Sequence, residues 1–304
     1  MKRRVISIFA VPFTALIMLM FVSCSGSKIP ADAIINFDSF ERDLSIDTPT
    51  PELVDKFNNG VPADYTTIKK DGKEFSGFIT ENKSFLDEVI APIIENHRDR
   101  FKQLPTAQII NELAIFGFEI FQKYFGKDFY RWGGDIFDLD DPQFEGVRHK
   151  FKYGLDCSGF TALPYELAVY FNLIDPKSAL FSSKGFKLYC KENSLEDTGG
   201  REGTANNFRL DTKEMALLGK EIFRIEKGSA ANNEQIKLLQ PGDIVGRSGH
   251  FGIIIFVNNK PYYLESGGWV VPPAGGFPVE AKTAIEVFAR NGYVSVRRCL
   301  EFDK

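Results

Sequence analysis

Residues 153–160 read YGLDCSGF and place Cys157 between Asp156 and Ser158, directly before an apolar run that reaches Phe171. A thiol attacks a carbonyl only as the thiolate, and a helix N-terminus stabilises that charge through its dipole and its free N–H groups. Either neighbour of the cysteine is of a type that caps a helix. The segment therefore predicts a helix that starts near Cys157, with a nucleophilic sulfur in its first turn and backbone N–H groups that could hold an oxyanion.

A cysteine nucleophile also needs a base, and the chain holds three histidines. His97 lies in a charged helical segment and His149 in a basic loop, so both are expected at the surface. His250 heads the apolar run HFGIIIF, where a titratable side chain is unusual unless it faces a cleft. We therefore expect His250 to be the base for Cys157. The alternative is a hydrogen-bonded histidine at the end of a strand, with no role in chemistry.

A third polar group usually orients the imidazole, and Glu265 is the candidate. If Asn258 and Asn259 form a two-residue turn between two strands, His250 lies opposite Gly267. Glu265 then falls two residues away on the same face of the sheet. A longer turn would change this parity and leave Glu265 as a carboxylate at the rim of the site.

The elements that position these residues change along the chain from helices to short strands. Residues 85–101 and 106–124 carry apolar side chains at helical spacing, with Thr106 as a candidate N-cap and Gly126 at the end. From Pro241 onward the apolar runs are short and rich in β-branched residues, as is typical of strands. The predicted strands are 243–245, 251–257, 262–264 and 294–296. Helices followed by an antiparallel sheet indicate the α+β class.

The first 23 residues have the layout of an export signal, with three cations before a largely apolar run that ends at Val22. The run is followed by Ser-Cys, which resembles the lipobox of bacterial lipoproteins, in which Cys24 becomes the lipidated first residue. The alternative is an uncleaved membrane anchor. In both cases the rest of the chain is expected to work in the cell envelope, tethered to a membrane. Ser25 after the lipidated position favours a periplasmic protein on the outer membrane, by analogy with lipoprotein sorting.

The predicted organisation has three parts: a signal peptide at 1–23, a tether with a smaller, mostly helical region at 24–104, and the domain of the cysteine at 105–304. The formal net charge is −4 and no basic stripe stands out, which argues against nucleic acid as a partner. No CxxC pair and no His/Cys cluster occurs, so neither a metal nor a cofactor is expected. Cys190 and Cys299 could pair outside the cytoplasm or remain two buried thiols.

Five segments, in order, resemble the NlpC-type cell-wall cysteine peptidases, a family with a papain-like fold. They span roughly residues 105–270 and read YRWGG, YGLDCSGF, LQPGDIV, GHFGIII and YYLES. The resemblance implies N-terminal helices packed on an antiparallel sheet. It also implies hydrolysis of peptide bonds in peptidoglycan stem peptides, such as the γ-D-glutamyl bond to a diamino acid.

By the same resemblance, Cys157 forms an acyl-enzyme, His250 takes the thiol proton and later protonates the leaving amine, and Glu265 orients His250. Three further residues match positions that the family uses around its substrate: Tyr130, Asp156 and Ser158. Each also has a purely structural alternative, as a core aromatic in the first case and as helix caps in the other two.

Two other functions stay open at this stage. Related papain-like scaffolds carry amidases and acyltransferases that act on lipids or other amides. A catalytically silent lipoprotein that only binds the cell wall is the third possibility. It predicts that Cys157 is no more reactive toward iodoacetamide than a free thiol, whereas both enzymes predict a more reactive sulfur.

Overall fold

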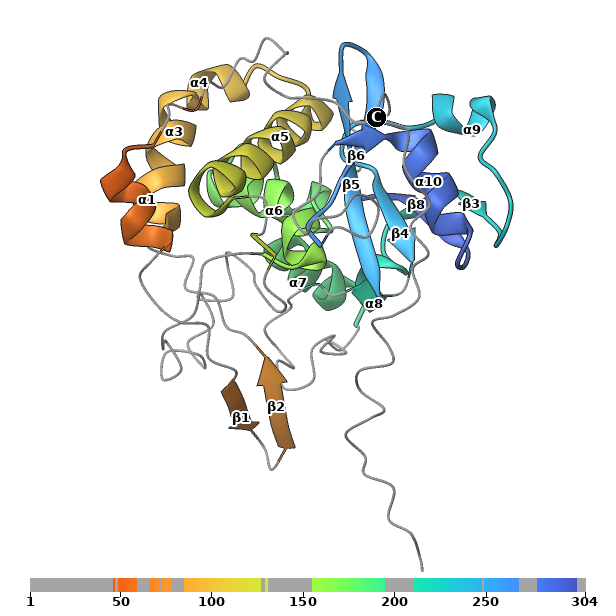
Figure 1. The fold of residues 1–304 in the computed structure, drawn as a ribbon, viewed down its shortest axis with the longest axis horizontal. Coiled ribbons are helices and arrows are strands. Elements are labelled where there is room, and N and C mark those ends of the chain that lie inside the picture. The colour runs from red at the N-terminus through yellow and green to blue at the C-terminus, as the bar shows by residue number, and fades with distance from the viewer. Residues whose placement is uncertain are drawn as a thin grey trace, which may run out of the picture.

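The computed structural model describes residues 46, 49–58, 66–70, 73–77, 85–126, 129–130, 155–194, 210, 212–247, 249–267 and 278–299. The signal peptide, Cys24 and most of the tether lie outside these residues, as do Trp132 to Gly134 and His149. The described part combines helices with an antiparallel sheet, which confirms the α+β class (Figure 1). Within it, no helix has both the length and the apolar character needed to cross a bilayer.

The main sheet has six strands in the order β3-β8-β4-β5-β6-β7, and each neighbouring pair is antiparallel. The strands are β3 (Lys220–Ile225), β4 (Ile244–Arg247), β5 (His250–Val257), β6 (Lys260–Leu264), β7 (Val279–Glu280) and β8 (Val294–Arg298). The four strands predicted from the sequence correspond to β4, β5, β6 and β8. The last strand, β8, lies between β3 and β4 and so joins the two parts of the sheet.

The β5–β6 hairpin has the two-residue turn that the sequence predicts. Val257 pairs with Lys260, and Asn258 and Asn259 have φ angles of 51° and 62°. Positive φ at both central residues is the requirement of a type I′ turn, which asparagine tolerates better than most residues. The same register pairs Ile253 with Leu264 and, continued to the end of the strands, places His250 opposite Gly267.

One face of the sheet packs against α5 (Thr106–Phe125) and α6 (Cys157–Tyr170), which contact each other along their length (Figure 1). Gly117 allows this close approach, because a Cβ atom there would lie 2.5 Å from Cδ2 of Leu163. Helix α5 begins one residue after Pro105, which is its N-cap, so the expectation that Thr106 caps it is wrong. Gly126 ends it as predicted, with a φ of 72°.

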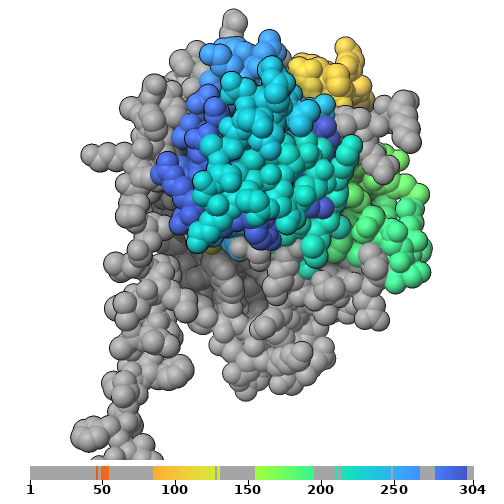
Figure 2. Space-filling model, turned by 90° about the vertical axis from the view of Figure 1, so that its right-hand side faces the viewer, coloured from red at the N-terminus to blue at the C-terminus, as the bar shows by residue number. Residues whose placement is uncertain are grey.

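The opposite face of the sheet is covered by α10 (Ala281–Ala289), and the two faces have separate hydrophobic cores. Along β5, Phe251, Ile253 and Ile255 belong to the core with α5 and α6, whereas Ile254 belongs to the core with α10. This alternation is the period of a strand that is buried on both faces. Figure 2 shows the side of the molecule formed by β3, α9 (Asn233–Lys237) and α10.

The N-terminal part contains α1 (Pro51–Asn58), a hairpin of β1 (Thr66–Lys70) and β2 (Lys73–Gly77), a π-helical turn η5 (Leu86–Ile90), α3 (Ala91–Asn96) and α4 (Arg98–Phe101). The sequence predicted one helix over 85–101. The π-helical turn comes just before Pro92, which has no N–H to donate, and a break at His97 separates α3 from α4. The hairpin was not expected in a mostly helical region.

Phe85 connects this part to α5. Its ring lies 5.3 Å from that of Phe121, 5.0 Å from Tyr124 and 4.9 Å from Phe125, measured between ring centroids. The hydrophobic core is therefore continuous across residues 104 and 105, and the division of the chain there stays a prediction. Three shorter elements complete the described part: η8 (Pro176–Ser178), α7 (Ser183–Glu192) and α8 (Thr212–Met215).

Candidate active site

Helix α6 begins at Cys157, and Asp156 is its N-cap. The carboxylate oxygen Oδ1 of Asp156 accepts hydrogen bonds from the Gly159 N–H at 2.7 Å and from the Ser158 hydroxyl at 2.8 Å. The capping predicted from the sequence is confirmed. Both side chains are buried, and these bonds give each a structural role; their contact with a substrate stays a prediction.

The helix start leaves two backbone donors at the sulfur. The Gly159 N–H is taken by the cap, and the Phe160 N–H bonds to the carbonyl of Asp156 at 2.8 Å. The N–H groups of Cys157 and Ser158 precede these and have no partner inside α6, as is general for the first turn of a helix. They point along the helix axis toward its N-terminal end, where they could stabilise an oxyanion.

The structure brings Cys157 and His250 together, with the two side chains in hydrogen-bond contact. On its other side, Nε2 of His250 lies 2.8 Å from Oε2 of Glu265. Because Nε2 is engaged by the carboxylate, Nδ1 is the ring nitrogen that remains for the sulfur. Sulfur, imidazole and carboxylate thus come from the start of α6, the start of β5 and the residue after β6.

Burial and charge act in opposite directions on the imidazole. Burial lowers the pKa of His250, but the negative sulfur of Cys157 and the carboxylate of Glu265 outweigh it and raise the pKa from 6.5 to about 9. The ring is 1% exposed, so water screens these interactions very little. The raised pKa therefore favours the imidazolium form of His250 at neutral pH.

None of the three described cysteines forms a disulfide, and they differ in exposure. Cys190 and Cys299 are 2% and 1% exposed and belong to the hydrophobic core, whereas Cys157 is 7% exposed. Of the two alternatives predicted for Cys190 and Cys299, a disulfide or two buried thiols, the structure has the two buried thiols. Among the described residues, no group of three or more His, Cys, Asp or Glu side chains could hold a metal ion.

Hydrogen bonds around Leu155 tie the segment before the cysteine to the end of the hairpin. The Leu155 carbonyl accepts a bond of 2.8 Å from the hydroxyl of Ser266, and its N–H donates to Phe129 at 3.1 Å. Leu155 also forms an isolated bridge with Tyr130. The structure thus places Tyr130 beside the segment that leads into Cys157, while its contact with a substrate stays a prediction. The sequence did not predict this contact of Ser266, because a serine that follows a strand forms no distinctive pattern.

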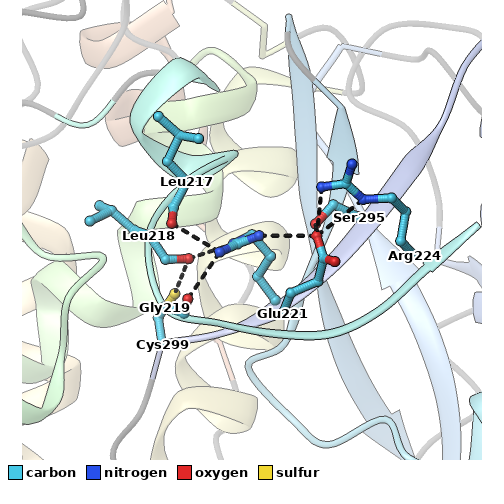
Figure 3. A network of polar contacts seen from close by, with 8 residues as sticks. Leu217, Leu218, Gly219, Glu221, Arg224, Ser295 and Cys299 are labelled. Atoms are coloured by element: carbon cyan, nitrogen blue, oxygen red, sulfur yellow. Dashed lines mark hydrogen bonds and ion pairs between the residues drawn. The ribbon is translucent and has the colours of Figure 1, made fainter.

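A second set of bonds supports the loop before His250. The Gly249 N–H donates to the hydroxyl of Thr212, at the start of α8, at 3.1 Å. The turn after α8 is fixed by Arg297, whose guanidinium donates to the carbonyls of Leu218 at 2.6 Å, Leu217 at 2.9 Å and Gly219 at 3.0 Å (Figure 3). Since α8 also contacts β5, the arginine stabilises an element next to the imidazole.

The aspartate of LQPGDIV has a structural role. Asp243 is buried and accepts two hydrogen bonds from Arg298, at 2.7 and 2.8 Å, and one from the Gln240 N–H at 2.8 Å. Burial raises its pKa, while Arg298 opposes the rise. These bonds fix the beginning of β4, the strand that pairs with β5.

This arrangement is suited to nucleophilic attack on a carbonyl. It provides a sulfur at a helix N-terminus, a buried imidazolium that can donate a proton, a carboxylate that fixes the ring, and backbone donors for an oxyanion. Comparison with protein-family models, with curated proteins and with solved structures found no match to this chain.

Proposed function

We propose that the protein is a cysteine peptidase that hydrolyses peptide bonds in peptidoglycan stem peptides. The observation that carries the proposal is the contact of Cys157, at the start of α6, with a buried imidazole that is itself bonded to Glu265. A papain-like arrangement of helix and sheet, and a lipid anchor on Cys24 that keeps the enzyme in the cell envelope, are parts of the same proposal. The γ-D-glutamyl bond to a diamino acid is the type of bond we expect it to cleave.

In the acylation step, the sulfur of Cys157 attacks the carbonyl carbon of the substrate and forms a tetrahedral intermediate. Its oxyanion is held by the N–H groups of Cys157 and Ser158 at the start of α6. The imidazolium of His250 then gives its Nδ1 proton to the amide nitrogen, the C–N bond breaks, and the amine leaves. A thioester on Cys157 and a neutral His250 remain.

In the deacylation step, neutral His250 takes a proton from a water molecule, whose oxygen attacks the thioester. The C–S bond breaks, the carboxylic acid product leaves, and Cys157 and His250 return to the thiolate and imidazolium. Glu265 accepts from Nε2 throughout, so Nδ1 faces the sulfur in both steps.

The substrate class is supported by the five ordered segments that resemble the cell-wall peptidases. Four of them include described residues that surround the same site: Tyr130, the Asp156–Ser158 turn, His250 with its strand, and Glu265. The remaining segment, LQPGDIV, contributes Asp243, which fixes the start of β4, the strand that pairs with the strand of His250. The export signal predicted at residues 1–23 supports the same substrate class, because such a signal directs a chain to the compartment where peptidoglycan lies.

The test is digestion of purified muropeptides by the full chain, followed by mass spectrometry of the products. We expect a shorter stem peptide with wild-type protein and none with Cys157→Ala or His250→Ala, each with an unchanged circular dichroism spectrum. Cys190→Ala is the matched control, because it removes a buried thiol outside the site and should keep turnover. Turnover by either site variant would exclude that residue from the mechanism.

Labelling with iodoacetamide separates the remaining functions. An enzyme of any papain-like class should be labelled at Cys157 faster than a free thiol at neutral pH, and His250→Ala should slow the labelling. Fast labelling without a muropeptide product would favour an amidase or acyltransferase with another substrate. Labelling at the rate of a free thiol would favour a silent binding protein.

A further inference from the structure

Tyr263, on β6, forms a hydrogen bond with the carboxylate that holds the imidazole. Its hydroxyl donates to Oε2 of Glu265 at 3.2 Å, and the same oxygen accepts from Nε2 of His250 at 2.8 Å. The tyrosine is fully buried, and it lies two residues before Glu265 on the face of the sheet that α10 covers. One carboxylate oxygen is therefore held from two directions.

Packing fixes the position of this hydroxyl. The ring of Tyr263 meets the ring of Phe288, from α10, edge to face at a centroid distance of 5.5 Å. Phe288 also lies against the ring of His250, at 5.9 Å and an interplanar angle of 38°. One aromatic side chain thus supports both donors to the carboxylate of Glu265.

Gly252 provides the space that the tyrosine occupies. A Cβ atom at this position would lie 2.5 Å from the hydroxyl oxygen of Tyr263 and 2.3 Å from the carbonyl oxygen of Leu264. Any larger residue would displace the ring or separate β5 from β6. The glycine two residues after His250 is thus explained by the path of the tyrosine side chain across the strand.

The hydroxyl of Tyr263 remains a donor at every pH at which the protein would work. Burial raises the pKa of Tyr263 well above its ordinary value, and the negative charges of Glu265 and Cys157 add to the rise. Because the hydroxyl stays protonated, it acts as a hydrogen-bond donor, and Oε2 of Glu265 is the acceptor within its reach.

We propose that Tyr263 is a positioning residue, which fixes Oε2 of Glu265 against Nε2 of His250 and so keeps the other ring nitrogen toward the sulfur. The inference rests on the proposed function only in taking His250 as the catalytic base. Among the described residues, the titratable neighbours of His250 include Cys157 from α6, Tyr263 from β6, Glu265 directly after β6, and Arg247, its cross-strand partner on β4. The guanidinium of Arg247 extends toward Gly292, between α10 and β8.

The test is an NMR titration of the full chain carrying ¹³C-labelled histidine, in wild type and in Tyr263→Phe. The variant keeps the ring against Phe288 and removes only the hydroxyl. If the hydroxyl positions the carboxylate, its loss lets Oε2 move away from Nε2 for part of the time. We then expect the pKa of His250 to fall by about half to one unit.

Tyr262→Phe is the matched control, since its side chain points to the other face of the same strand and packs with the α5–α6 core. It should leave the titration of His250 unchanged. In the background of Glu265→Gln, Tyr263→Phe should have no further effect, because the hydroxyl acts through the carboxylate. A protein that merely loses packing would respond to Tyr263→Phe in both backgrounds, and that result would overturn the proposal.

An unchanged or raised pKa in Tyr263→Phe would also overturn it, a raised value meaning that the hydroxyl only shields the carboxylate. Gly252→Ala is a second route to the same displacement and should lower the pKa of His250 in the same direction. None of these measurements uses a substrate. Failure of muropeptide digestion would therefore leave the positioning role intact, and failure of the titration would leave the proposed function intact.

Discussion

The charge of His250 gives the sharpest prediction. Its pKa of about 9, against an ordinary value of 6.5, is the balance of burial, which lowers it, and of Cys157 and Glu265, which raise it. The net rise corresponds to roughly 3 kcal/mol in favour of the imidazolium. Removing the negative partners one at a time should therefore lower the pKa in separate steps.

The two single variants should lower the pKa of His250 by different amounts. The effect of the Cys157 sulfur on the imidazole is larger than that of the carboxylate, so Cys157→Ser should lower the pKa more than Glu265→Gln. Each should lower it by about 1–3 units, the usual effect of an opposite charge within contact distance. In the double variant only burial remains, and the pKa should then lie below 6.5.

The assay is a pH titration by NMR with ¹³C-labelled histidine. The chain has three histidines, so His97→Gln and His149→Gln assign the other two signals. The reasoning would be refuted by a wild-type value at or below 6.5, or by a double variant that titrates above either single variant.

Three further predictions concern stability. Asp156→Ala should lower the free energy of unfolding by about 0.5–2 kcal/mol because the cap of α6 is lost, whereas Asp156→Asn should retain most of it, as measured by urea denaturation. Arg297→Met should lower that free energy by about 2–4 kcal/mol, since three backbone carbonyls and Glu221 lose a charged donor; an unchanged denaturation midpoint would contradict the role of the network. The raised pKa of His250 should contribute stability that is fully present below pH 6.5 and lost as the pH rises through about 9. Between pH 6.5 and pH 9, the free energy of unfolding of the wild type should fall by up to roughly 3 kcal/mol more than that of His250→Gln. Equal losses in the two proteins would contradict the raised pKa of His250.

Local signals predicted the parts of the site that depend on local geometry. The Asp-Cys-Ser-Gly segment fixes the start of α6 because a capping side chain bonds only to the first turn. The Asn-Asn pair fixes the register of the hairpin, and with it the face on which Glu265 lies, because strand parity follows from the length of the turn. Both expectations used residues close in sequence, and both agree with the structure.

The rest depends on contacts between distant segments. We did not predict β3 or α10 from the sequence, although the buried residues of α10 are spaced as on one face of a helix: Ala281, Ala284, Ile285, Phe288 and Ala289. Without α10, Phe288 could not be placed, and the role of Tyr263 beneath it was missed. The insertion of β8 between β3 and β4 is likewise a pairing of segments far apart in the chain, which no local pattern encodes.

The position of His250 at the first residue of β5 follows from the two faces of the sheet. By strand alternation its side chain lies on the face of α10, where it meets Phe288, whereas the sulfur belongs to α6 on the opposite face. A side chain of one face can meet a helix of the other only where the strand ends and no longer separates them.

The bond from Ser266 to Leu155 supports this geometry, because it joins the residue two positions after β6 to the residue two positions before α6, around the same end of the sheet. Two residues further along β5, at Gly252, a side chain would be enclosed by Leu264 and Tyr263 instead. The chemistry we propose therefore requires the histidine at the strand terminus and a glycine at the second position after it. Exchanging the two residues should leave the sulfur without a base even if the sheet still forms.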